Sequence, residues 1–254
     1  MMISNHESRK KSTKRFIPNI LTLLNMFLGF FSIVLILGGE PIKGGTLILF
    51  AAILDAFDGK VARVLGIDSQ FGMEFDSLAD TVSFCVVPSV LIYSLYVDGL
   101  PTLLGGFISF IPLMFGTIRL AKFNLEKSEI KSQPFTIGLT TPASTITLFA
   151  YLFFCKDLYG SYGDPRTALM LVASLGVLMV SPISFNKFPL LSFKSGKANS
   201  FFLVSFILWL ILFFVYRGLV LFPMSLLYIG WNIFRWLTFS GRNSIQSQID
   251  HSGS

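Results

Sequence analysis

The stretch that decides the fold reads Asp55-Ala56-Phe57-Asp58-Gly59-Lys60-Val61-Ala62-Arg63 and, eight residues later, Gly72-Met73-Glu74-Phe75-Asp76-Ser77-Leu78-Ala79-Asp80. The carboxylates of each run are three or four residues apart, so on a helix each set shares one face. The connection Val64–Phe71 is short enough to make the two helices antiparallel neighbours. The pattern therefore predicts that four aspartates converge near one end of two adjacent helices.

The sequence around these runs is that of a membrane protein. Hydrophobic residues make up 53% of the 254-residue chain and charged residues 13%, whereas a soluble domain usually has about 25% charged residues. The mean hydropathy is +0.69. A soluble protein with one very large core is disfavoured because the apolar runs recur at membrane length.

The apolar runs predict an all-α, polytopic transmembrane bundle of about eight helices. Each run is near the length that a hydrocarbon core of ~30 Å requires, and no alternating strand pattern of the barrel type is present. The expected helices cover residues 17–37, 44–66, 73–97, 101–121, 137–156, 167–184, 200–217 and 219–237. We expect a basic segment over 1–15, a transmembrane catalytic domain over 16–240 and a polar, disordered tail over 241–254.

The basic residues predict the orientation. If both termini lie in the cytoplasm, 16 of the 20 Lys and Arg residues fall in inside segments, as the positive-inside rule requires. Only Lys43, Lys156, Arg166 and Arg217 then lie outside. A basic face beside anionic lipid heads accounts for the net charge of +6 without nucleic acid.

The cysteines and histidines exclude several chemistries. Cys85 and Cys155 lie in or beside apolar segments, with neither a disulfide framework nor metal-ligand spacing. His6 and His251 stand in the polar terminal segments. Histidine-dependent hydrolysis and zinc sites are therefore not expected.

Four carboxylates at a membrane boundary would repel one another, so a cation is expected among them. Oxygen ligands select Mg²⁺, Mn²⁺ or Ca²⁺ over zinc, and a two-metal arrangement suits substitution at phosphorus. Ion pairs with nearby Lys or Arg are the alternative. Gly59, Ala62 and Gly72 lie on the same faces and lack bulk, which suits either a flat bound group or close helix packing.

The two runs match every position of the pattern D-x2-D-G-x2-A-R-x8-G-x3-D-x3-D, and the chain thereby resembles the CDP-alcohol phosphotransferase family. The resemblance implies a six-helix core, a homodimer, and transfer of a CMP-linked phosphoryl group to an alcohol with release of CMP. It implies that Asp55, Asp58, Asp76 and Asp80 bind Mg²⁺ or Mn²⁺, as one ion or two, and that Asp80 takes the hydroxyl proton. It also implies that Arg63 binds a nucleotide phosphate, with Gly59, Ala62 and Gly72 beside the cytidine.

Three further stretches resemble the membrane-integral, bacterial phosphatidylserine synthases of that family: Ile17–Asn25, Asp76–Phe84, and Arg119–Asn124 with Phe135–Ala143. In the first stretch, Pro18 suits a helix start. Thr22 and Asn25 are one turn apart and are expected at the nucleotide; capping and interhelical hydrogen bonding are their alternative roles. In the last stretch Thr140 replaces a proline of the usual G-L-P-x-P pattern, which slightly weakens the assignment of serine.

The resemblance favours CDP-diacylglycerol as donor and L-serine as acceptor. Arg119, Lys122 and Asn124 are candidates for holding the serine carboxylate or a lipid phosphate, and anchoring at the membrane surface is the alternative for the basic pair. Glycerol 3-phosphate or inositol as acceptor, a cation-dependent transporter and an inert structural subunit remain as other hypotheses. We expect the enzyme in the bacterial cytoplasmic membrane, with its site near the cytoplasmic face.

Overall fold

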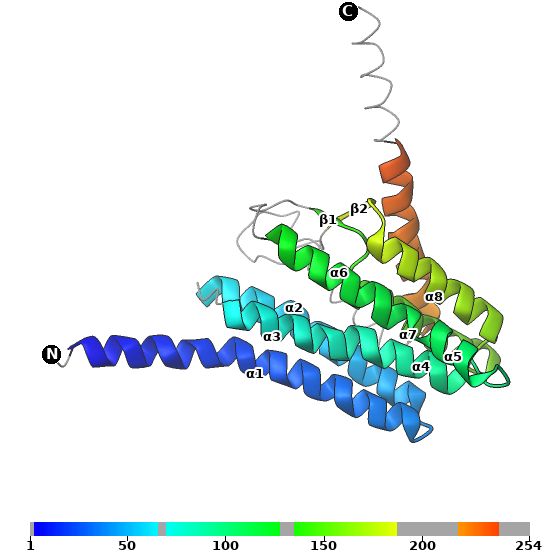
Figure 1. Ribbon diagram of the computed structural model, residues 1–254, viewed down its shortest axis with the longest axis horizontal. Coiled ribbons are helices and arrows are strands. Elements are labelled where there is room, and N and C mark those ends of the chain that lie inside the picture. Colours follow the sequence, from blue (N-terminus) through cyan, green and yellow to red (C-terminus); the bar gives the residue numbers. More distant parts are fainter. Residues whose placement is uncertain (1–2, 66–69, 128–134, 187–217, 239–254) are drawn as a thin grey trace, which may run out of the picture.

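The computed structural model describes residues 3–65, 70–127, 135–186 and 218–238, with side chains for all of these except 3–18, 60–65, 126, 127, 135 and 186. Most of them are helical, and the helices from α1 to α8 run back and forth roughly along one long direction (Figure 1). The predicted helical membrane fold is confirmed in this coarse form.

The first two helices form an antiparallel hairpin. Helix α1 (Ile3–Leu37) turns through Gly38 and Gly39 into α2 (Pro41–Leu65), and Gly39 has a φ of +82° that favours glycine. The hairpin is closely packed at Gly44, where an added Cβ would lie 2.9 Å from the Ile36 side chain and 3.0 Å from the Ser32 carbonyl oxygen. The Ser32 hydroxyl donates to the Gly44 carbonyl at 2.9 Å.

The third stretch is one rod with a π-helical turn in it. Helix α3 (Gln70–Thr81) continues through η1 (Val82–Val86) into α4 (Val87–Leu95). Pro88 has no N–H to give to the Phe84 carbonyl one turn earlier. The buried Thr145 hydroxyl donates to that carbonyl instead, at 2.7 Å, so a group on a distant helix satisfies the wide turn.

The remaining elements pack over these helices. They are α5 (Thr102–Ser109), α6 (Ile111–Lys127), β1 (Phe135–Ile137), α7 (Thr141–Tyr159), α8 (Pro165–Val180) and β2 (Ser184–Asn186), followed by a steeply inclined helix over Gly218–Thr238 (Figure 1). The strands β1 and β2 pair antiparallel, with Thr136 opposite Phe185. The core runs through η1, α4, α7 and α8 and includes Phe84, Phe149 and Leu152.

Four helical stretches of the described chain are long and apolar enough to cross a membrane: Asn19–Leu37, Gln70–Leu95, Thr102–Leu125 and Gly218–Thr238. Helix α2 is not among them, because five charged residues interrupt its sequence. Large apolar side chains such as Phe27, Phe30 and Leu37 are exposed on α1, as expected of a surface that faces lipid tails.

Several boundaries differ from the prediction. The expected first helix, 17–37, begins earlier, at Ile3, so Pro18 lies inside it rather than at its start; the lysines and arginines before Pro18 favour helix. The expected helix 137–156 begins only at Thr141, after β1. Thr140 is its N-cap and accepts a hydrogen bond from the Ala143 N–H at 3.4 Å, so the residue replacing proline has a structural role. The expected helix 200–217 and tail 241–254 lie outside the described residues.

Candidate functional site

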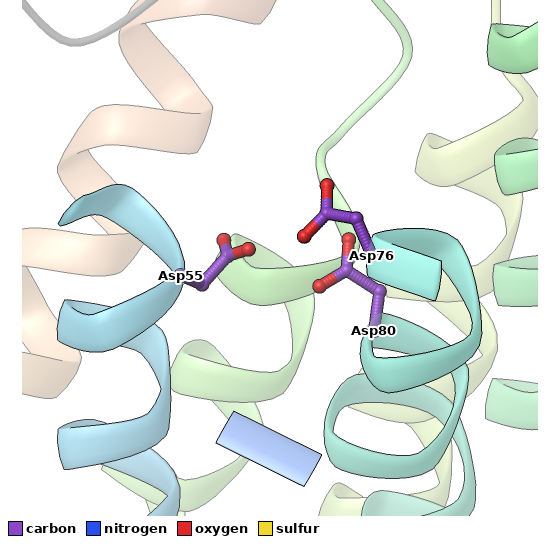
Figure 2. A group of neighbouring side chains, drawn as sticks. All are labelled: Asp55, Asp76 and Asp80. Atoms are coloured by element: carbon purple, nitrogen blue, oxygen red, sulfur yellow. The ribbon is translucent and has the colours of Figure 1, made fainter. Parts of the chain in front are cut away.

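Three aspartates from two helices form the centre of the site. Asp55 of α2 faces Asp76 and Asp80, which stand on successive turns of α3 (Figure 2). One carboxylate oxygen from each lies within 4.8 Å of the others, and all three side chains are half-buried. The spacing within each signature run therefore has the predicted result: the two helices bring their carboxylates together.

Asp58, the fourth predicted ligand, lies beside this group rather than in it. It is one turn from Asp55 on α2 and only 4% exposed. One of its oxygens accepts a hydrogen bond from the Thr22 hydroxyl of α1 at 3.3 Å. Helix α1 thus orients Asp58 toward the group, and Thr22 reaches the site through this carboxylate.

Asp80 in this group and Asn25 on α1 have buried polar atoms that lack a hydrogen-bond partner among the described residues. Asp80 Oδ1 is buried and accepts no hydrogen bond from the described residues. Both polar atoms of the fully buried Asn25 side-chain amide likewise form no hydrogen bond with the described residues. Buried polar groups are normally hydrogen-bonded, so these atoms fit a site that is completed by a ligand.

The donor set fits a hard divalent cation. Asp80 lies within electrostatic range of Asp55, Asp58 and Asp76, and such close like charges cost free energy unless a cation lies among them. Carboxylate oxygens are the ligands that Mg²⁺ and Mn²⁺ prefer. The site therefore has the composition of a metal centre with positions left for substrate oxygens.

The small residues of the signature differ in how exposed they are and in how much of them the structure describes. Gly59 is exposed, and a Cβ added to it would meet nothing within 4 Å, so its surface is open to a bound group. Gly72 lies on the first turns of α3, half-buried. Ala62 and Arg63 continue α2 beyond Gly59, but their side chains lie outside the described residues.

The three acceptor candidates on α6 have different surroundings. Arg119 is 8% exposed, and its Nη1 lies 3.5 Å from the Thr141 hydroxyl. The Asn124 amide donates to the Ser77 hydroxyl of α3 at 2.9 Å. Lys122 is exposed. The structure thus brings only Arg119 into the interior, within electrostatic range of Asp80 and Asp55.

Some polar contacts around the site were not predicted from the sequence. Ser83 of η1 donates to the Asn25 carbonyl at 3.0 Å, and Thr141 accepts from Arg119. Both residues stand in stretches that resemble the family, but their partners are far away in sequence. The residues of each pair, Asn25 with Ser83 and Arg119 with Thr141, are not related by a helical spacing. Only the packing of different helices brings them together.

Fold and site together define a helical membrane protein with an acidic centre suited to a divalent cation and its anionic substrate. The chain belongs to the CDP-alcohol phosphatidyltransferase family, whose model matches residues 15–179. This match covers the hairpin α1–α2, both signature runs and the helices up to α8.

Similar proteins of known name extend the comparison. The chain is 34% identical over 222 residues to a CDP-diacylglycerol–serine O-phosphatidyltransferase of Helicobacter pylori, covering 87% of this chain and 90% of the relative. It is 36% identical over 173 residues to an archaetidylserine synthase of Methanothermobacter thermautotrophicus, covering 66% and 69%. A CDP-diacylglycerol–serine O-phosphatidyltransferase of Methanocaldococcus jannaschii is 34% identical over 173 residues, covering 68% and 75%.

Proposed function

We propose that this chain synthesises phosphatidylserine, by transferring the phosphatidyl group of CDP-diacylglycerol to the hydroxyl of L-serine with release of CMP. The observation that carries the proposal is the convergence of Asp55, Asp76 and Asp80 from the two signature helices. The relatives support serine as acceptor, because serine appears in the names of both the CDP-diacylglycerol–serine O-phosphatidyltransferase and the archaetidylserine synthase, although the two names differ in the lipid. Because these two names differ in the lipid, they leave the lipid chains of the donor unspecified.

Asp55, Asp58, Asp76 and Asp80 would hold one or two Mg²⁺ or Mn²⁺ ions. Oxygens of Asp55, Asp76 and Asp80 are close enough to share a cation, Asp58 lies beside them, and no described residue donates a hydrogen bond to the buried Asp80 Oδ1. When bound, such ions offset the charge of the pyrophosphate and stabilise the leaving CMP. Thr22 would keep Asp58 oriented toward this centre through its hydrogen bond.

Asp80 is the residue that we assign as general base. A serine hydroxyl is a weak nucleophile at neutral pH, and a positioned carboxylate can accept its proton as the new P–O bond forms. The bond between that phosphorus and the CMP oxygen breaks, and CMP leaves with the electron pair. The proton on Asp80 then passes to water. No covalent enzyme intermediate is required.

The remaining signature residues are assigned to the nucleotide half of the donor. Gly59 presents open backbone surface, on which a flat cytosine can lie, and Gly72 and Ala62 belong to the same faces. The buried amide of Asn25, which has no hydrogen-bond partner among the described residues, suits a polar group of the ligand. Arg63 would bind a phosphate, and Thr22 supports this half of the site from α1.

We place the site near the cytoplasmic face of a bacterial inner membrane, with both termini on that side. The distribution of Lys and Arg supports this orientation. The surrounding lipid then supplies the donor directly from the bilayer. We also propose a homodimer, which rests on the family resemblance alone, and one transmembrane catalytic domain over residues 16–240, which rests on the recurring apolar runs.

An acceptor panel tests the proposal. The purified full-length protein, in detergent with CDP-diacylglycerol, is given L-serine, glycerol 3-phosphate or inositol, each with and without Mg²⁺ or Mn²⁺. We expect CMP release that depends on serine and on the cation, with phosphatidylserine as lipid product. Release with another acceptor alone would contradict the serine assignment, and release that is indifferent to a chelator would contradict the metal centre.

A further inference from the structure

Arg119 is a buried cation whose surroundings leave it incompletely satisfied. Only 8% of the residue is exposed. Among the described residues its Nε has no hydrogen-bond partner, and the hydrogen bond seen there runs from Nη1 to the Thr141 hydroxyl at the long distance of 3.5 Å. A guanidinium offers five N–H donors, so most of its capacity is unused.

The elements around Arg119 do not supply an anion at contact distance. Helix α6 packs most closely against α8 and also contacts η1, α3, α4 and α7. From these, Cys85 and Thr141 face the guanidinium, and the Phe123 ring of α6 itself lies 5.7 Å from Cζ. Asp80 and Asp55 act on it electrostatically, but no carboxylate of the described residues forms an ion pair with it. Burying such a charge costs free energy unless an anion accompanies it.

Resting on the proposed function, we infer that Arg119, supported by Thr141, binds the carboxylate of the acceptor and thereby selects an amino acid over simpler alcohols. The acceptor hydroxyl must reach Asp80 to lose its proton, and Arg119 stands within electrostatic range of that residue. Arginine binds a carboxylate through two parallel hydrogen bonds. Helix α6 carries no part of the signature, so it can vary with the acceptor while the nucleotide site stays the same.

The other two candidates on α6 are less suited to this task. The Asn124 amide donates to Ser77 and so links α6 to α3. Lys122 is exposed, where solvent weakens a charged contact. The assignment therefore separates Arg119 from its neighbours and gives them distinct expected effects.

A purely electrostatic role is the competing explanation, in which Arg119 balances the acidic group and touches no substrate. The two roles differ in one measurable respect. A counter-charge affects turnover with every acceptor alike, whereas a carboxylate-binding residue affects only acceptors that have a carboxylate. The test therefore compares L-serine with L-serinamide, which keeps the hydroxyl and the amine but has no carboxylate.

The experiment measures KM and kcat for CMP release from CDP-diacylglycerol with full-length wild type, Arg119→Gln, Arg119→Lys and a matched control, Lys43→Gln, which removes an exposed cation far from the site. We expect Arg119→Gln to raise the KM for serine about 10- to 100-fold, with a smaller rise for Arg119→Lys. The wild-type preference for serine over serinamide should disappear in Arg119→Gln. The KM for the CDP-lipid should stay within about threefold, and thermal stabilisation by CMP checks that each variant is folded; if Arg119→Gln fails this check, Arg119→Lys decides.

Three outcomes would overturn the inference while leaving the proposed function intact: an unchanged KM for serine, an equal loss with serine and serinamide, or a rise in the KM for the CDP-lipid alone. The last would mean that the anion is a phosphate of the donor. If neither wild type nor Lys43→Gln releases CMP with serine, but both do so with another acceptor, the proposed function fails and the inference fails with it.

Discussion

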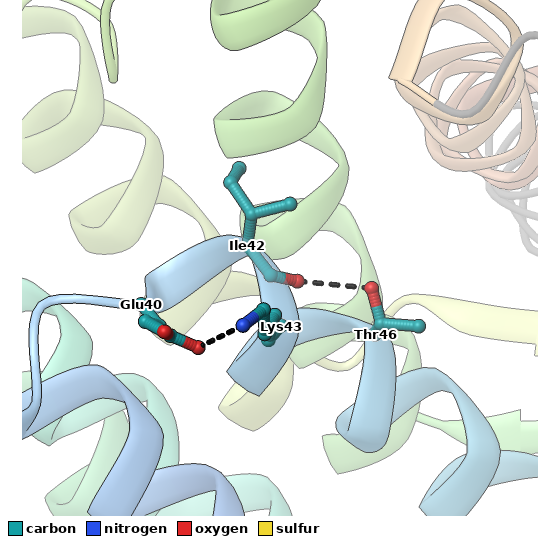
Figure 3. Close-up of polar contacts among 4 residues, drawn as sticks. All are labelled: Glu40, Ile42, Lys43 and Thr46. Atoms are coloured by element: carbon teal, nitrogen blue, oxygen red, sulfur yellow. Dashed lines mark hydrogen bonds and ion pairs between the residues drawn. The ribbon is translucent and has the colours of Figure 1, made fainter.

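The two ends of α2 hold their charged side chains in opposite ways. At its first turn, Lys43 Nζ lies 2.7 Å from Glu40 Oε2, and the Thr46 hydroxyl donates to the Ile42 carbonyl at 2.9 Å (Figure 3). Toward the other end, Asp55 faces two further carboxylates (Figure 2). The polar groups at the first end form an ion pair and a hydrogen bond with residues next to them in sequence, whereas the other end brings together side chains of like charge.

The contrast extends to the helices beside α2. At the end that holds Lys43, Asp164 caps α8 by accepting from the Thr167 N–H, and Lys156 donates to the Gly160 carbonyl at 3.0 Å. At the aspartate end, Asn25 and Arg119 have buried polar atoms for which the described residues supply no hydrogen-bond partner. Polar groups that serve only the fold find local partners, so the unsatisfied end is where a ligand is expected.

The largest effect should come from removing the proposed base. Asp80→Asn keeps the shape of the side chain but cannot accept the hydroxyl proton, so kcat should fall by about 10²- to 10⁴-fold. Serine-dependent CMP release measures the loss, with circular dichroism to check the fold. Glu40→Gln at the other end of α2 is the control and should keep full activity; an Asp80→Asn variant as active as that control would refute the assignment.

The next effect concerns the cation and can be read without activity. Mg²⁺ or Mn²⁺ should raise the thermal stability of the wild type, by about 2.7 kcal/mol at 100 times its Kd. Without a cation, Asp80→Asn should be more stable than the wild type, because one of the mutually repelling charges is gone. Differential scanning fluorimetry with and without chelator measures both; equal responses in the two proteins would argue against a cation at this group.

A smaller effect is expected where α1 supports the group. Thr22→Val removes the hydroxyl that donates to Asp58 at 3.3 Å and nearly preserves side-chain volume. A hydrogen bond to a charged group contributes about 1.5–3 kcal/mol, and the long distance of 3.3 Å places this one near the lower end, so kcat/KM should fall about 10- to 20-fold. Thr46→Val, which loses a hydroxyl bonded only within α2, is the matched control. Equal activities of the two variants would mean that Thr22 does not position Asp58.

The smallest effect is expected at the opposite end. Glu40 and Lys43 are exposed, with side-chain exposures of 45% and 70%, and an exposed pair contributes about 0–1 kcal/mol. Lys43→Gln should therefore change the free energy of unfolding by less than about 1 kcal/mol and leave KM and kcat unaltered. A large loss of activity would show that the two ends of α2 are coupled and that the exposed pair does more than serve the fold.

The sequence by itself determined the helical membrane class, the two signature helices and their aspartates. These features have local signals: apolar runs of membrane length and carboxylates at intervals of three and four residues. Such signals can be read from the sequence without knowledge of the tertiary structure. The helix predicted at 219–237 is observed at Gly218–Thr238 for the same reason. The short strands were not predicted, because Thr136 and Phe185 pair across a separation that no period in the sequence records.

Only the tertiary structure decided which of the predicted residues belong together. It grouped Asp55 with Asp76 and Asp80, bound Asp58 to Thr22, and separated the buried Arg119 from the exposed Lys122 three residues along the same helix. It also placed Thr145 against the carbonyl that Pro88 leaves free. Burial and hydrogen bonding depend on what other helices bring to a side chain, and spacing along a single helix does not contain that information.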